Sequence, residues 1–99
     1  MWDKRLRRVY LHYNRRYFGD KLPKDIELVW ESLTGSLFGY QMGDKIALNA
    51  KMKHADVIWR GTLLHEMVHL ELPANVKHGP RFRKRMRELV AQGAFDGLI

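Results

Sequence analysis

The segment from residue 56 to residue 72 constrains the fold most strongly, because it is apolar almost all round a helix. A segment of this kind is typical of a helix buried in a small core. The exception is a narrow polar stripe of Thr62, His65, Glu66 and His69, whose spacing places them on one helical face. Unpaired polar groups on a buried helix cost roughly 1 to 3 kcal/mol each. The stripe therefore requires a partner.

Residues 65–69 read His-Glu-Met-Val-His. On a helix His65 and His69 lie one turn apart, so both imidazoles can bind one metal ion. Glu66 flanks that point, and its carboxylate can take a proton from a water on the metal, as a zinc peptidase requires. The alternative is a chance match of common residues, and the apolar helical context favours the metal site. We predict that His65 and His69 bind Zn²⁺ and that Glu66 is catalytic.

Two residues compete to be the third metal ligand of a catalytic zinc site, which keeps its fourth position for water. His78 lies nine residues after His69, in the segment that must turn back after Pro73. Glu88 lies nineteen residues after His69, a spacing that some zinc peptidases use. Glu88 can instead pair with basic neighbours on an exposed helix. We favour His78, because a loop residue is free to aim at the metal whereas Glu88 lies at the margin of a core face.

Composition and length indicate one globular domain over residues 1–99, with 45% hydrophobic and 29% charged residues. No apolar run approaches the ~18 residues of a membrane span, and the N-terminus lacks the apolar stretch of a signal peptide. We therefore expect a monomer that is not secreted, has no membrane partner, and is cytoplasmic or associated with the nucleoid or nucleus. Cysteine is absent, so any metal must be held by His and carboxylates.

Positive charge is concentrated in two short segments of a chain whose net charge is +7. Residues 4–16 hold six Lys and Arg and residues 81–87 hold five, with no acid in either segment. Such clustering predicts a polyanion partner, with single-stranded DNA the form we favour. The alternative is that both segments are solvated helix faces that serve solubility. The candidate nucleic-acid-binding residues are Arg5, Arg8, Arg15, Arg16, Arg81, Arg83, Lys84 and Arg87.

Helical periodicity predicts two further helices. One spans residues 3–18 and ends at Gly19, and its apolar face includes Trp2, Leu6, Val9, Tyr10, Tyr13 and Tyr17. The other begins at Gly79-Pro80 and buries Phe82, Met86, Leu89 and Val90. Pro73 must end the central helix. Within that helix Gly61 costs about 1 kcal/mol relative to Ala, so we expect another element to pack closely against it.

Three strands are predicted between the first two helices, at residues 26–31, 36–41 and 45–49. The last two are joined by a tight turn at residues 42–44. Because the connections are short, we expect all three strands to be antiparallel neighbours. The expected class is α+β, a compact domain with an N-terminal helix, a three-stranded antiparallel sheet, an HExxH helix and a C-terminal helix.

Four segments occur together along the chain. They are Tyr13-Asn14-Arg15-Arg16-Tyr17-Phe18, Trp30, Leu63-Leu64-His65-Glu66-Met67-Val68-His69 and His78-Gly79-Pro80-Arg81-Phe82. In this combination the chain resembles the SprT-like zinc-peptidase domain of the Spartan/SprT family over roughly residues 9 to 90. HExxH alone is shared by many peptidases, whereas its combination with His-Gly-Pro-x-Phe is considerably more specific. The resemblance implies a zincin fold, with His78 as the third zinc ligand.

The resemblance also implies peptide-bond hydrolysis and a role linked to DNA, since Spartan-like members digest proteins crosslinked to DNA. Many relatives carry a cysteine zinc ribbon, so in this cysteine-free chain we expect DNA contact from the basic helices alone.

The expected mechanism has one Zn²⁺ on His65, His69 and His78, with a water whose pKa is lowered toward about 7. Glu66 takes the proton from that water and returns it to the leaving amine. A protein or peptide substrate would lie as an added strand along an exposed sheet edge. Two rivals remain, a nucleic-acid-binding module with a structural zinc site and no hydrolysis, and an interaction protein with an unused site. Neither rival gives Glu66 a role.

Overall fold

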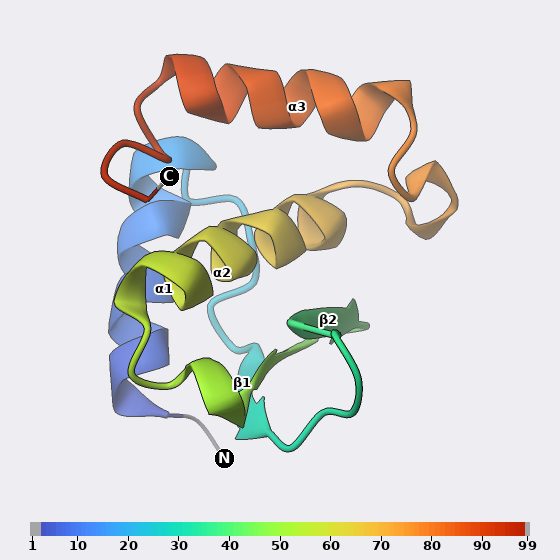
Figure 1. The fold of residues 1–99 in the computed structure, drawn as a ribbon. Helices are drawn as coiled ribbons and strands as arrows, with labels where there is room; N and C mark the ends of the chain where they lie inside the picture. The colour runs from blue at the N-terminus through green and yellow to red at the C-terminus, as the bar shows by residue number, and fades with distance from the viewer. Residues whose placement is uncertain (1–2, 99) are drawn as a thin grey trace.

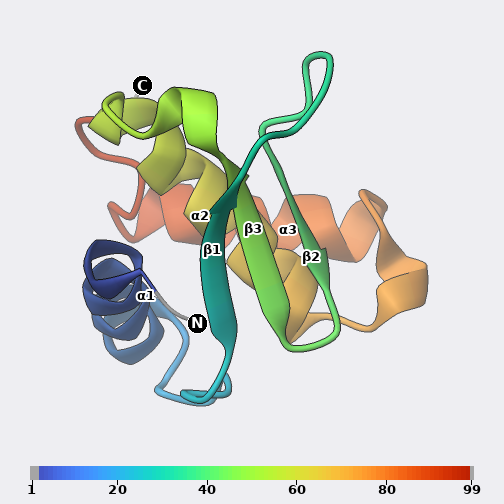
Figure 2. The same cartoon turned by 90° about the horizontal axis from the view of Figure 1, so that it is seen from below.

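Helix α2 (Asp56–Glu71) is covered by a β-sheet on one side and by the C-terminal helix α3 (Pro80–Ala91) on the other (Figure 1). This arrangement comes from a computed structural model that describes residues 3–98. The N-terminal helix α1 (Lys4–Tyr17) lies beside the sheet, next to its first strand (Figure 2). Short 3-10 turns precede α2 at Ala50–Met52 and follow it at Ala74–Val76. Among the helices of residues 3–98, none combines the length and apolar character needed to span a membrane.

Helix α1 begins and ends where its local chemistry dictates. The Asp3 carboxylate accepts hydrogen bonds from the backbone N–H groups of Arg5 and Leu6, which caps the helix. Gly19, with φ of +61°, follows the last turn in the left-handed conformation that favours glycine. Of the apolar face predicted for this helix, Leu6, Tyr10 and Tyr13 are buried, Val9 and Tyr17 are partly buried against the core, and Trp2 lies outside the described residues.

Asn14 of α1 is fully buried, which the sequence reasoning did not anticipate. Its side-chain amide donates to the carbonyl of Leu22 at 3.0 Å and its side-chain oxygen accepts from the N–H of Leu22 at 3.0 Å. Because both the nitrogen and the oxygen of the amide are hydrogen-bonded, burial of Asn14 leaves no unpaired polar group. The same two hydrogen bonds hold the loop after α1 against the helix.

The three strands form a mixed sheet, so the prediction of a fully antiparallel sheet is wrong. The strands are β1 (Glu27–Glu31), β2 (Gly39–Met42) and β3 (Lys45–Asn49), arranged in the order β1-β3-β2. β2 pairs antiparallel with β3 through the predicted tight turn, but β1 pairs parallel with β3. The chain passes from β1 to the far edge of the sheet, and β3 then returns between the two other strands (Figure 2).

The burial of β3 explains its central place. Ile46, Ala47 and Leu48 are all fully buried, so this strand has apolar contacts on both of its faces. A central strand reads as a continuous apolar run, whereas a half-exposed strand alternates. Short connections favour spatial proximity but do not require consecutive strands to pair, and β1 and β2 lie on opposite sides of β3.

Helix α2 contains residues 65–69 and ends before Pro73, and most of its apolar residues are in the core. Two exceptions lie in its first turn, where Val57 is 47% exposed and Ile58 is 46% exposed. Val90 of α3 was also predicted to be buried and is 52% exposed. The prediction that these three side chains join the core is wrong, because neither the sheet nor a second helix covers their positions.

Two glycines, Gly39 in β2 and Gly61 in α2, differ in how closely other residues pack against them. A Cβ on Gly39 of β2 would lie 2.7 Å from the carbonyl oxygen of Ala47 in β3 and 3.2 Å from the Cγ2 of Thr62 in α2, so only glycine lets β2 lie this close to both elements. A Cβ on Gly61 of α2 would meet only a ring carbon of Phe95, at 3.9 Å. The close packing predicted at Gly61 therefore occurs at Gly39 instead.

This contrast predicts opposite effects for two Gly→Ala substitutions. Gly39→Ala should lower the free energy of unfolding by about 1 to 3 kcal/mol because the added methyl overpacks the junction of β2 and α2. Gly61→Ala should raise it by about 0.5 to 1 kcal/mol, because alanine is the better helix former and the methyl has room. Urea denaturation of both variants measures the two changes, and equal destabilisation would contradict the packing described for Gly61.

Candidate metal centre

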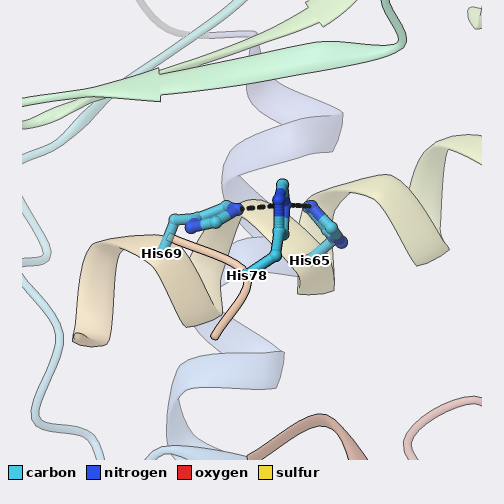
Figure 3. Close-up of side chains that lie close together, drawn as sticks. All are labelled: His65, His69 and His78. Carbon is cyan, nitrogen blue, oxygen red and sulfur yellow. Dashed lines mark hydrogen bonds between the residues drawn. The ribbon is translucent and has the colours of Figure 1, made fainter. Parts of the chain in front are cut away.

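Three histidines from two segments of the chain converge on one point (Figure 3). The Nε2 atom of His78 lies 3.1 Å from that of His69 and 3.2 Å from that of His65. His65 and His69 come from adjacent turns of α2, whereas His78 comes from the loop that precedes α3. The structure thus brings together the residues predicted as metal ligands.

A tight turn orients His78. The N–H of Gly79 donates to the carbonyl of Val76 at 3.0 Å, and Lys77 between them has φ of +50° and ψ of −127°. These angles fit the first central position of a type II′ turn, which usually carries glycine. Gly79 then caps α3 and Pro80 occupies its first turn, where a missing N–H costs nothing. Lys77 is therefore in a strained backbone conformation, and the turn directs the side chain of His78 back toward α2.

The ring of Phe82 packs against all three imidazoles. Its ring stacks on His69 with centroids 4.5 Å apart, and it meets the rings of His65 and His78 edge-on, each at 4.9 Å. Phe82 is buried in the first turn of α3. The spacing in His78-Gly79-Pro80-Arg81-Phe82 therefore has a physical reason, because the segment delivers a ligand candidate and the apolar platform beneath it.

The donor chemistry of this cluster fits a cation. A ring N–H donates one hydrogen bond, and a neutral imidazole has a single unprotonated nitrogen to accept one. The Nε2 of His78 faces two other Nε2 atoms, so neutral imidazoles cannot satisfy both contacts well. Two nitrogens bound to one tetrahedral Zn²⁺ at about 2.0 to 2.1 Å would lie about 3.3 Å apart, close to both observed separations.

The two histidines of α2 have lowered pKa values, which favours their unprotonated forms at neutral pH. Burial, with smaller contributions from His69 and His78, lowers the pKa of His65 to about 4. Burial and the neighbouring His78 also lower the pKa of His69. Since imidazole binds metal only when it is unprotonated, these shifts leave both nitrogens of α2 ready to bind a cation at pH 7.

Glu66 lies beside the cluster, where its side chain is only 6% exposed. Burial raises the pKa of its carboxyl from 4.5 to about 7, and no charge or hydrogen bond within residues 3–98 contributes to that shift. A bound cation nearby would favour the ionised form and bring the pKa down again. The carboxyl is thus placed to change protonation state near neutral pH.

Two grooves meet at His65 and Glu66. One has a volume of about 540 Å³ and extends toward the start of α2, and the other has a volume of about 490 Å³ and contains His69 and His78. Gly39 borders both grooves, which places the outer strand β2 along one wall. Sequence reasoning did not single out Tyr40 or Lys77, which line the second groove. The candidate metal centre is therefore open to solvent through grooves that border the outer strand of the sheet.

Glu88 lies away from this centre. Its carboxylate is exposed and lies 3.6 Å from the guanidinium of Arg85, and it is absent from the groups within residues 3–98 that could hold a metal. The exposed ion pair foreseen as its alternative role is present, and the structure favours His78 over Glu88 as the third ligand candidate.

The basic residues predicted to contact nucleic acid have two different roles in the structure. Arg5 donates to the carbonyl of Lys53 at 2.6 Å and lies over the ring of Trp59, so it is engaged within the fold. Arg85, outside the predicted set, is likewise tied to Glu71 and to the carbonyl of Tyr17. The other seven are in part or wholly solvent-facing on α1 and α3. They are Arg8, Arg15, Arg16, Arg81, Arg83, Lys84 and Arg87.

Comparison with known protein families agrees with this geometry. The SprT-like family matches residues 6–96, nearly the whole chain. The chain therefore belongs to the SprT-like family. Comparisons with the curated proteins and with the solved structures gave no match. Family membership and the histidine cluster together fit a metal-dependent enzyme of the metalloprotease type.

The geometry predicts which residues control metal affinity. His78→Ala should abolish tight zinc binding, because two imidazoles of α2 alone cannot complete the site. Glu88→Ala should bind zinc as tightly as the wild type. Competition with a chromophoric chelator measures both affinities, and the reverse pattern would rule out His78 as a ligand.

The raised pKa of Glu66 predicts a pH-dependent change in the stability of the metal-free protein. Because folding favours the protonated carboxyl, this contribution is fully present below pH 4.5 and is lost as the pH rises toward 7. Gln does not titrate, so the stability of metal-free Glu66→Gln relative to the wild type should rise by about 2 to 3 kcal/mol between pH 4.5 and pH 7. Urea denaturation with chelator present measures the difference. His65 titrates in both proteins and cancels, so a stability difference between the two proteins that stays constant from pH 4.5 to pH 7 would contradict the shift.

Proposed function

We propose that this protein is a zinc-dependent endopeptidase that hydrolyses peptide bonds in protein substrates. The observation that carries the proposal is the position of Glu66, a buried carboxyl beside three converging imidazoles at the meeting point of two open grooves. A structural zinc site has no use for a base at its edge, and it is closed to water. The open grooves favour hydrolysis over a structural role.

His65, His69 and His78 would hold one Zn²⁺ through their Nε2 atoms. When bound, zinc supplies the Lewis acidity that activates a water and polarises the peptide carbonyl. A carboxylate oxygen of Glu66 accepts the proton of the attacking water and then donates it to the nitrogen of the leaving amine. Phe82 keeps the imidazoles in place beneath this reaction, since it contacts all three rings.

The edge strand β2 would position the substrate. One side of β2 pairs with β3 and its other side is unpaired within the sheet. An extended peptide can add to such an edge through main-chain hydrogen bonds, which are largely independent of sequence. An added strand would cross the meeting point of the grooves, and its backbone would pass His65 and Glu66.

We also propose that the protein acts as a monomer on proteins associated with DNA, single-stranded DNA in particular. The support is electrostatic, because seven of the eight predicted arginines and lysines are available on α1 and α3. Arg15 and Arg16 border a groove of about 430 Å³ that Gln92, just after α3, also lines, so the two basic helices approach each other at this end. Contact with phosphates would weaken linearly with the logarithm of salt concentration.

One experiment tests both parts of this proposal. Zinc-loaded wild type should hydrolyse an unfolded protein, and Glu66→Gln should retain zinc while its rate falls by at least about 100-fold, the usual contribution of a general base. Gel assays of product formation, each with and without single-stranded DNA, measure the rates. Hydrolysis that survives in Glu66→Gln would overturn the peptidase mechanism. Rates that DNA leaves unchanged, together with binding insensitive to salt, would overturn the DNA association alone.

A further inference from the structure

The groove of about 540 Å³ beside Glu66 is lined mainly by apolar side chains. Four of them remain about half exposed, at 46–54%, although they are large and apolar. They are Leu37, Phe38, Val57 and Ile58. Within residues 3–98, only Met42 and Val90 are further large apolar residues with comparable exposure. The uncovered apolar surface is thus gathered next to the candidate site, and exposed apolar patches of this kind mark binding surfaces.

This groove is continuous with the candidate metal centre. His65 and Glu66 form part of its wall, and Met86, Phe95 and Leu98 line it as well. Its volume lies in the range of pockets that bind small molecules or a few side chains, and such pockets are mainly apolar with few polar groups. A side chain that enters it must belong to a residue close to the bond held beside Glu66.

The direction of β2 indicates which substrate residue reaches the groove. Ser36 and Phe38 precede β2 and border only the apolar groove, whereas Tyr40 and Gln41 of β2 border only the second groove. β2 therefore runs away from the apolar groove. A peptide that pairs antiparallel with β2, the more stable pairing, runs toward it. The part of the peptide that follows the bond at Glu66 then lies over the apolar groove.

We propose that this apolar groove binds a large apolar side chain of the residue immediately C-terminal to the cleaved bond, and that it thereby sets a cleavage preference. The inference rests on the proposed peptidase function. Leucine, isoleucine, phenylalanine and methionine gain from leaving water in such a groove. An acidic side chain would lose its hydration there without gaining a partner from the apolar wall.

Substitution at Ile58 gives the sharpest test, because this side chain is exposed and its loss should leave the core intact. Val90→Asp is the matched control, since Val90 is as exposed and lies outside the groove. Zinc-loaded wild type, Ile58→Asp and Val90→Asp each digest unfolded casein, and mass spectrometry identifies the new N-terminal residues. Rates are then measured on three peptides that differ only in Phe, Asp or Lys after the cleaved bond.

The wild type and Val90→Asp should favour apolar new N-termini and should cleave the Phe peptide at least about 10-fold faster than the Asp peptide, as expected for a buried side chain. Ile58→Asp should lose at least about 10-fold in kcat/KM on the Phe peptide and gain on the Lys peptide, because the new carboxylate attracts a cation. New N-termini without apolar preference, unchanged by Ile58→Asp, would overturn the inference while leaving the peptidase proposal intact.

A binding measurement decides the inference if no Glu66-dependent hydrolysis is found. Zinc-loaded Glu66→Gln is titrated with the Phe and Asp peptides, and NMR follows the methyl groups of Val57 and Ile58. Chemical-shift changes of these methyl groups with the Phe peptide but not with the Asp peptide would support the groove as a site for an apolar side chain. Equal shifts with both peptides, or none with either, would overturn it.

Discussion

The polar stripe of α2 is the constraint on which the rest of this structure depends. The helix must be covered on most of its surface to fold, yet His65, Glu66 and His69 must remain accessible on one face if they are to act. The sheet and α3 cover the apolar faces, and the stripe opens onto the two grooves between them. A helix offers at most two ligands at this spacing, so the third imidazole has to come from another segment.

The turn before α3 meets that requirement. Lys77 adopts a positive φ so that His78 points back to α2, and Phe82 in the first turn of α3 packs against the imidazole rings. In the metal-free protein, burial keeps His65 unprotonated at neutral pH and raises the pKa of Glu66 to about 7. Burial is unfavourable for the charged forms of these groups. It therefore leaves the imidazole nitrogens free to bind a cation, and it brings the pKa of the carboxyl into the range needed for proton transfer.

Local signals in the sequence predicted the helices and the candidate ligands well. Asp3 and Gly19 bound α1 as their chemistry requires, Pro73 ends α2, and the short His-Gly-Pro-x-Phe segment places His78 at the cluster. These features depend on residues within one or two turns of each other. The sequence held no comparable signal for the central position of β3, because Leu28 to Trp30 in β1 is an apolar run of the same length as Ile46 to Leu48 in β3.

Features that depend on distant packing were not predictable in the same way. The parallel pairing of β1 with β3 follows from where the loop after β1 crosses the sheet, and a count of loop residues does not determine this. Apolar periodicity likewise did not distinguish Ile58, left exposed in the groove, from Leu63 in the core. Charge clustering did not separate Arg5, which binds a backbone carbonyl, from Arg8, which faces solvent.

The central claim is that three imidazoles hold one zinc ion and leave a position open for water. X-ray absorption at the zinc edge, recorded on the protein loaded with one equivalent of zinc, measures the ligand set directly. The account predicts three imidazole nitrogens and one oxygen in the wild type, and no three-imidazole shell in His78→Ala, which should no longer bind zinc tightly. A shell with two imidazoles in the wild type, or one closed by four protein ligands, would contradict it.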